Sequence, residues 1–235
     1  MSDLAWILLL SWLAGFAATI GGLFAWVEGS AETLGKQELV HSMVAFGGGI
    51  LLAAVAFALA PHAMHDLSVV GLAASVIAGG LVFLFLDAWV SRRSGSLAQL
   101  MALLMDFIPE AIALGALFGT DRQAGYLLAG FIAAQNLPEG FNAFRELNRF
   151  LRPRAAVAAL AGVGLLGPLA AYTGYGLLQE QATMTAVIMA FATGGILYLI
   201  FQDIAPQARM QRHWAPPLGA VVGFTLGMVG ERLLG

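Results

Sequence analysis

The sequence predicts an all-α integral membrane protein that crosses the bilayer eight times. Of its 235 residues, 60% are hydrophobic and 11% are charged, whereas about 25% of residues are charged in a soluble domain. Apolar runs of about 20 residues, long enough to cross about 30 Å of hydrocarbon, recur along the whole chain. None of these runs alternates between polar and apolar residues, so helices are favoured over a β-barrel.

Polar clusters, glycines and prolines divide the chain into its expected spans. The first span follows no basic region and precedes no convincing cleavage site, so we expect it to stay in the membrane. Glycines scattered inside the spans allow close helix–helix approach in lipid. The chain forms a single transmembrane domain over 1–235, with spans at about 4–27, 39–61, 69–91, 97–119, 124–145, 155–178, 183–206 and 215–234.

Basic residues are concentrated in alternate links between these spans. Only Arg122 and Arg232 lie outside the first, third, fifth and seventh links. The positive-inside rule places those odd-numbered links in the cytoplasm and both termini outside. We therefore expect a multi-pass protein of the plasma (inner) membrane. Cysteine is absent, which excludes disulfides and thiolate metal ligands.

Two Pro-Glu motifs interrupt the fourth and fifth spans, in "MDFIPEAIALG" at 105–115 and "AAQNLPEGFNAF" at 133–144. Their polar residues lie within about one helical turn of the bilayer midplane. A carboxylate at that depth costs at least about 2.5 kcal/mol, and no Lys or Arg lies at the same depth to neutralise it. Protonation or a bound cation must therefore compensate these charges.

The spacing within each motif favours a cation. Asp106 and Glu110 project from one face of the fourth span, and Gln135 and Glu139 project from one face of the fifth. A short link makes these spans antiparallel neighbours, so their polar faces converge. Oxygen ligands from two helices suit a divalent metal ion.

The prolines add possible ligands. Pro109 deprives the carbonyl of Met105 of its helical partner, and Pro138 does the same to Ala134. A freed carbonyl at membrane depth needs protein, water or an ion to satisfy it. One such motif is explained equally well by a packing kink with a protonated glutamate. Two motifs at matched depth favour the ion.

These motifs resemble those of the ZIP (Zrt/Irt-like) divalent metal transporters, specifically the small bacterial branch. The fourth and fifth spans carry DFIPEA at 106–111 and QNLPEG at 135–140, and two further stretches look alike, "GGGILLAAVAFALAPH" and "FATGGILYLIFQDIAPQA". The resemblance implies a ZIP-like eight-helix bundle that takes up zinc, iron or manganese by alternating access. Its partners are the lipid bilayer and the metal ion, without nucleic acid, organic cofactor or catalytic activity, and a homodimer stays open.

The resemblance also implies a set of metal-binding residues. The primary site consists of Asp106, Glu110, Gln135 and Glu139, with Asp106 where the family usually has histidine. Exchanging imidazole for carboxylate shifts preference from zinc toward harder ions such as manganese, ferrous iron or magnesium. Asp203 lies where the family often has an acidic residue on the release path.

The family's second, adjacent site is reduced in this sequence. Phe107 replaces its asparagine, Asn136 replaces its acidic residue, and Gly167 replaces its carboxylate in the sixth span. We therefore expect one ion rather than two, with a phenyl ring partly filling the second position. In addition, Ile50 replaces a methionine of the second span that can bind the primary ion.

Two other functions stay open. A membrane-embedded metal-dependent hydrolase needs an additional base or histidine-rich ligation, and no histidine lies in the middle of a predicted span, since His41 stands at the cytoplasmic start of the second. A transport-impaired homologue would use the same carboxylates for proton titration without binding metal.

Overall fold

The computed structural model describes residues 2–29, 33–93, 98–119, 121–178, 181–211 and 213–234. Within these ranges the regular structure is helical, apart from an isolated bridge between Met210 and His213. The all-α prediction is therefore confirmed. The helices are α1 (Asp3–Glu28), α2 (Leu34–Ala53), η1 (Ala54–Leu59), α3 (Ala60–Asp66), α4 (Val69–Arg93), α5 (Ala98–Phe118), α6 (Arg122–Leu147), α7 (Pro153–Leu178), α8 (Ala182–Leu199), η3 (Ile200–Ile204), α9 (Ala205–Gln207) and α10 (Leu218–Leu234).

Two of the long helical rods contain a π-helical segment, η1 between α2 and α3 and η3 between α8 and α9. Each segment precedes an Ala-Pro pair, ending in Pro61 and Pro206 respectively. Proline lacks an N–H and its ring crowds the carbonyl four residues earlier. The wider π turn accommodates the proline without ending the helix, and such segments are frequent at functional sites. The second segment carries Asp203.

Six rods are long and apolar enough to cross a membrane: Asp3–Glu28, Leu34–Asp66, Val69–Val90, Leu100–Phe118, Pro153–Leu178 and Ala182–Gln207. The other two expected spans correspond to α6 and α10. Helix α6 is 26 residues long but is interrupted by polar side chains, and α10 has 17 residues. Both pack alongside the other helices, α6 mainly against α1 and α10 mainly against α2.

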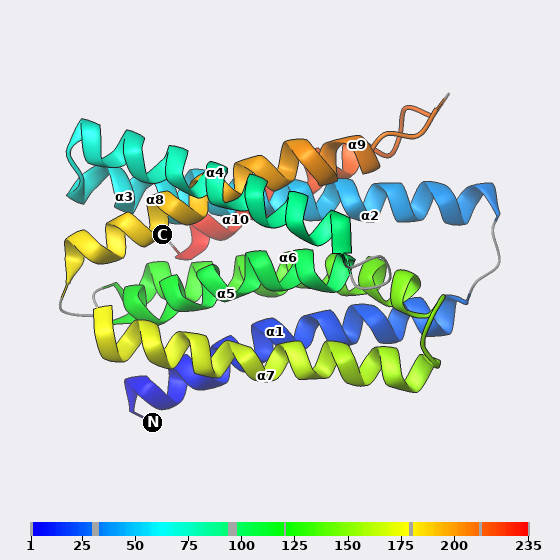
Figure 1. The fold of residues 1–235 in the computed structure, drawn as a ribbon, viewed down its shortest axis with the longest axis horizontal. Helices are drawn as coiled ribbons and strands as arrows, with labels where there is room; N and C mark the ends of the chain where they lie inside the picture. The colour runs from blue at the N-terminus through cyan, green and yellow to red at the C-terminus, as the bar shows by residue number, and fades with distance from the viewer. Residues whose placement is uncertain are drawn as a thin grey trace.

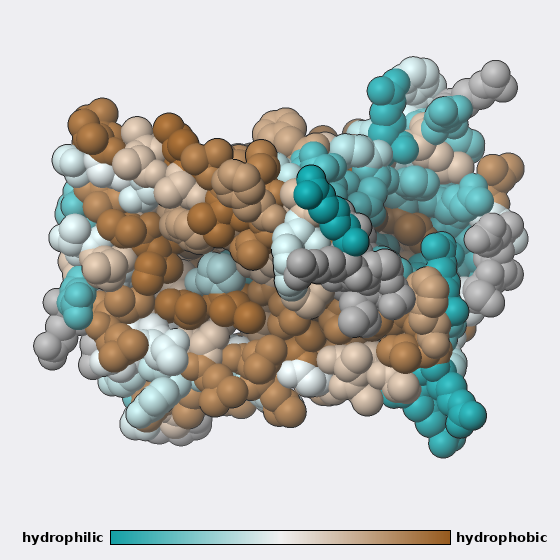
Figure 2. Space-filling view, viewed as in Figure 1, coloured by the Kyte–Doolittle hydropathy of each residue, from teal (hydrophilic) through white to brown (hydrophobic). Residues whose placement is uncertain are grey.

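Both chain ends lie at the same end of the bundle, as Figure 1 shows. Hydrophilic side chains gather at the opposite end, while apolar side chains cover much of the visible length of the helices (Figure 2). Lys36 and Arg145, which belong to odd-numbered links or their borders, both pair with Glu28 at the end of α1. This polarity fits the expected even number of crossings, and the assignment of this end to the cytoplasm stays a prediction.

The helices pack as two groups of four, which form the lower and upper layers in Figure 1. The first group contains α1, α5, α6 and α7. The second contains the α2–α3 rod, α4, the α8–α9 rod and α10. We refer to them below as the first and second helix groups.

Glycines allow the closest helix pairs to touch backbone to backbone. In the α1–α6 pair, a methyl group on Gly21 would collide with the carbonyl oxygen of Leu137, and one on Gly140 would collide with that of Ala18. Helices inside lipid gain no hydrophobic free energy when they associate, so they depend on close van der Waals packing, which small residues allow. The same reciprocal arrangement holds α5 to α7 through Gly115 and Gly174, α4 to α8 through Gly79 and Gly194, and α2 to α10 through Gly49, Gly219 and Gly223.

This packing predicts opposite effects for two substitutions on α7. Gly174→Ala places a methyl group against the carbonyl oxygen of Ile112, and overpacking of this kind costs about 1–3 kcal/mol. Gly176 faces open space, so Gly176→Ala should be neutral or stabilising by up to about 1 kcal/mol through the better helix propensity of alanine. Thermal unfolding of both variants in detergent measures the difference. Equal unfolding midpoints would contradict the packing account.

Candidate metal site

The two Pro-Glu motifs lie inside the bundle, on neighbouring helices of the first group. Helices α5 and α6 both continue through their prolines, Pro109 and Pro138. Glu110 and Gln135 are completely buried, and Asp106 is 5% exposed. Because the two helices belong to one packed group, the backbone fixes these side chains relative to one another.

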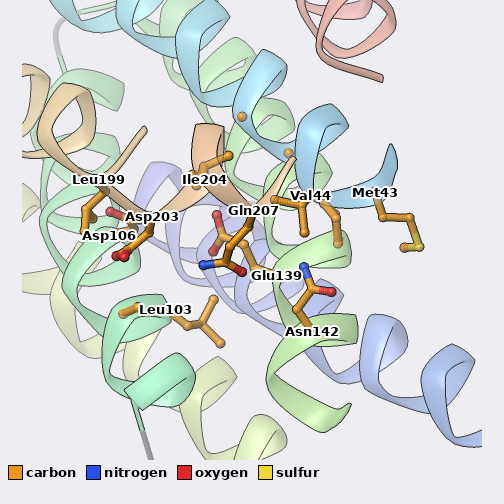
Figure 3. Close-up of a pocket in the computed structure, with 14 residues that line it drawn as sticks. Met43, Val44, Leu103, Asp106, Glu139, Asn142, Leu199, Asp203, Ile204 and Gln207 are labelled. Carbon is orange, nitrogen blue, oxygen red and sulfur yellow. The ribbon is translucent and has the colours of Figure 1, made fainter. Parts of the chain in front are cut away.

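A small cavity of about 60 Å³ lies between α2, α5, α6 and η3. Three of the predicted site residues line it: Asp106 from α5, Glu139 from α6 and Asp203 from η3 (Figure 3). Helix α2 closes one wall with Gly47, where an added methyl group would lie 3.1 Å from the ring of Pro138. The cavity therefore lies between the two helix groups, with two carboxylates from one and a third from the other.

Glu110 and Gln135 lie beside the cavity rather than on its wall. The Gln135 side-chain amide donates a hydrogen bond to Oε2 of Glu110, and neither residue lines the cavity. Asn136 faces away toward α1, where its amide nitrogen donates to the carbonyl oxygen of Ala14 at 2.9 Å. Asp106, Glu139 and Asp203 thus line one cavity. The other three predicted residues, Glu110, Gln135 and Asn136, do not line it.

The predicted residues carry an unusual number of buried oxygens without hydrogen-bond partners. Among the described residues, six such atoms belong to them: Oδ1 of Asp106, Oε1 of Glu110, Oε1 of Gln135, Oδ1 of Asn136, and both carboxylate oxygens of Glu139. Leaving a buried polar group unsatisfied costs about 1–3 kcal/mol, and more when it is charged. All six atoms are carboxylate or amide oxygens, which are ligands for hard divalent cations.

The charged side chains described around the cavity are all acidic. The Asp106 carboxylate lies close enough to those of Glu139, Glu110 and Asp203 to interact with their charges, and no Lys or Arg is among the described residues that line the cavity. In the described part of the chain, no three His, Cys, Asp or Glu side chains yet gather closely enough to hold one ion between them. Binding of one ion by three of these carboxylates would therefore require them to move closer together.

Phe107 fills a space beside the site. It is one of the residues at which the sequence departs from the motifs it resembles. Its ring is fully buried and packs between glycines of α1 and α7: a methyl group on Gly15 or on Gly167 would approach the end of the ring to 2.5 or 2.7 Å. The missing side chain at Gly167 is therefore what makes room for the ring. The position expected for a second ion contains a phenyl group and offers no carboxylate.

Three further cavity residues were not identified from the sequence: Met43, Asn142 and Gln207. Asn142 lies three residues after Glu139, and Gln207 lies four residues after Asp203. That helical spacing from an acidic residue is a signal that would have found both. Met43 had no such signal, because it lies in an ordinary apolar run, two turns before the buried Ile50.

The cavity continues toward the hydrophilic end of the bundle. A second pocket of about 230 Å³ shares Val44, Asn142 and Gln207 with it and extends to Arg145, Glu146 and Arg149. In the opposite direction the path meets fully buried apolar residues, Ile50, Leu114 and Ile132. The candidate site is therefore reached from the end of the bundle that the basic residues assign to the cytoplasm.

The sequence matches no protein-family model. A stretch of 141 residues, 58% of this chain, is 32% identical to the zinc transporter ZIP13 homolog of Drosophila melanogaster. This match spans 40% of the length of that protein. The similarity therefore relates most of this chain to part of a longer zinc transporter.

The packing of Phe107 leads to a test of the local structure. Phe107→Ala should reduce stability by about 3–5 kcal/mol, because it removes a fully buried ring from between three helices. Phe85→Ala is the matched control, since Phe85 is 68% exposed on α4 and packs against few neighbours. Thermal unfolding in detergent compares the two variants, and similar losses in both would contradict the assignment of Phe107 to a packed interface.

Proposed function

We propose that this chain is a ZIP-family transporter that carries a divalent metal ion across the membrane. The observation that supports this most strongly is the set of six buried, unpartnered oxygens on Asp106, Glu110, Gln135, Asn136 and Glu139. A divalent cation satisfies such acceptors and cancels their charge at once. The similarity to a zinc transporter supports the same class of substrate.

In the proposed mechanism, Glu110 and Glu139 are the main ligands of the ion. Asp106 and Gln135 complete the site, and Asn136 provides an outer oxygen. Gln135 already orients Glu110 through its hydrogen bond, which leaves Oε1 of Glu110 free to bind. The carboxylates replace the water of the incoming ion, so the ion crosses the apolar middle of the membrane among protein oxygens.

The arrangement corresponds to a state that is open toward the cytoplasm. From the site, the ion would pass Asp203 and Gln207, then Asn142, and leave at the hydrophilic end. At the other end, His62 on α3 lies 3.7 Å from Asp121 at the start of α6, and this contact joins the two helix groups. Uptake requires this end to open while the cytoplasmic end closes.

Movement of one helix group against the other provides that exchange. The principal ligands all belong to α5 and α6, within the first group, whereas Asp203 belongs to the second. Sliding or rocking of the first group therefore carries the site past α2 and η3 without disturbing the ligands. Glycine contacts hold each group together internally, and fewer contacts join the groups to each other.

The proposed site takes one ion and prefers hard metals. Its ligands are oxygens, with Asp106 replacing the imidazole that a zinc site would favour. Phe107 occupies the neighbouring space and Gly167 supplies no ligand. Manganese, ferrous iron and zinc are the candidate substrates, with manganese or ferrous iron favoured over zinc.

Metal uptake into proteoliposomes tests the proposal. We expect wild-type protein to accumulate Mn²⁺, and the Glu110→Gln, Glu139→Gln double variant to lose at least about 90% of that uptake, because a tenfold loss requires only about 1.4 kcal/mol. Glu231→Gln, on α10 and outside the cavity, is the matched control. If the double variant folds and still takes up Mn²⁺ as well as the wild type, these carboxylates are not the transport site.

Selectivity has its own test at Asp106. Asp106→His introduces an imidazole ligand, so the ratio of zinc to manganese uptake should rise by about tenfold or more. Competition between the two metals in the same vesicles measures that ratio directly. An unchanged ratio would exclude Asp106 from the coordination of the ion.

A further inference from the structure

A second, larger cleft lies on the outside of the second helix group. It has a volume of about 1070 Å³ and is bounded by α2, η3, α9, the segment that follows α9, and the beginning of α10. Its lining residues are mostly small or apolar. The cleft is open on one side, so it faces the surroundings of the bundle rather than its interior.

The floor of the cleft is long enough to contact part of one acyl chain of a lipid leaflet. Along α2 it runs from Ala45 through Gly48 and Gly49 to Leu52, a rise of about 10 Å at 1.5 Å per residue. One leaflet contributes about 15 Å of hydrocarbon. Gly48 and Gly49 are buried at the bottom of the cleft, where they pack against Ile204 and the backbone of α10, and Leu52 is the exposed residue of this wall.

The mouth of the cleft carries a positive charge. Arg209 lines it and is exposed, and among the described residues it forms no ion pair. By contrast, Lys36 and Arg145 at the same end both pair with Glu28, each at 3.0 Å. His213 lies at the mouth 3.9 Å from Glu38.

Trp214 marks the depth of this mouth. It lines the cleft and is 89% exposed. Exposed tryptophans of membrane proteins are enriched at the headgroup level, where an apolar ring and a polar N–H are both accommodated. Arg209 and Trp214 therefore lie where a headgroup would be, and the apolar floor lies where an acyl chain would be.

We propose that this cleft binds an anionic phospholipid, with its phosphate on Arg209 and one acyl chain along Gly48, Gly49 and Leu52. The positive mouth selects the anionic headgroup, because each basic residue near the surface attracts anionic lipid by about 1 kcal/mol. The open side gives access from the bilayer, and the floor offers no polar partner for a water-soluble ligand. The volume exceeds that of most small-molecule sites, which suits a chain that enters from the lipid.

The lipid site shares a wall with the metal cavity. Gly48 and Ile204 line both spaces, and a methyl group on Gly48 would approach Cγ2 of Ile204 to 2.6 Å. Ile204 directly follows Asp203 in η3. An acyl chain against its outer side therefore supports the segment that holds Asp203 in the cavity. This second step, lipid control of metal release, rests on the proposed function, whereas lipid binding does not.

Native mass spectrometry of the detergent-purified protein, titrated with phosphatidylglycerol or phosphatidylcholine, tests the binding. We expect phosphatidylglycerol to bind more tightly, and Arg209→Ala to weaken its binding about fivefold. Arg154→Ala, which removes an exposed arginine on α7 away from the cleft, should leave binding unchanged. Ala205→Trp, which fills the cleft from a position outside the metal cavity, should reduce binding of both lipids.

Several outcomes would overturn the proposal. These are equal affinity for the two lipids, equal losses in the Arg209→Ala and Arg154→Ala variants, or undiminished binding in a folded Ala205→Trp protein. Competition by soluble glycerol phosphate that equals the effect of the lipid would assign the site to a free phosphate compound instead. An unchanged thermal midpoint in lipid-free detergent establishes that each variant is folded.

Transport separates this inference from the proposed function. In vesicles of phosphatidylcholine that also contain phosphatidylglycerol, Ala205→Trp should slow Mn²⁺ uptake. In phosphatidylcholine alone it should have no effect. Loss of lipid binding without any change of uptake would reject lipid control, and absent uptake in every protein would reject the transport function while leaving the lipid site intact.

Discussion

One constraint governs the account of this structure: several buried side-chain oxygens of the Pro-Glu motifs have no hydrogen-bond donor. An apolar bundle can tolerate a carboxylate at depth only if something satisfies it, and here several carboxylate and amide oxygens lie together without a hydrogen-bond partner. Among the described residues, neither arginine nor lysine lines their cavity. In the proposed function, a divalent cation that binds and leaves satisfies these oxygens. A permanent ion pair with Lys or Arg would also satisfy them, but it would leave no oxygen free to bind an incoming ion.

The proposed transport requires these oxygens to keep their places relative to one another. Reciprocal glycine contacts hold α1 to α6 and α5 to α7, and α5 and α6, which carry the two Pro-Glu motifs, also pack directly against each other. The π segment that carries Asp203 belongs to the opposite helix group. The same segment forms the wall between the inner cavity and the outer cleft, so the proposed ion and lipid sites share Ile204.

The spacing of the polar residues was readable from the sequence, whereas the rotation of each helix was not. The i, i+4 pairs put Asp106 with Glu110 and Gln135 with Glu139 on shared helix faces, but in the structure Asp106 and Glu139 line the cavity and Glu110 and Gln135 do not. Asn136 turned instead to the backbone of α1, since that orientation depends on the close approach of α1 at Gly140. Pro61 suggested the end of a span, yet the rod continues to Asp66 because the π turn absorbs the proline. The sequence analysis expected the Phe107 ring to fill part of the second position, and in the structure the ring packs against Gly167.

An anomalous-difference map from crystals grown with Mn²⁺ tests the central claim most directly. The account predicts one peak per chain between α5 and α6, within coordination distance of carboxylate oxygens of both Glu110 and Glu139. It also predicts continuous density for the Phe107 ring beside that peak. A well-ordered map without a peak there, or with the ion bound only by surface residues, would contradict it.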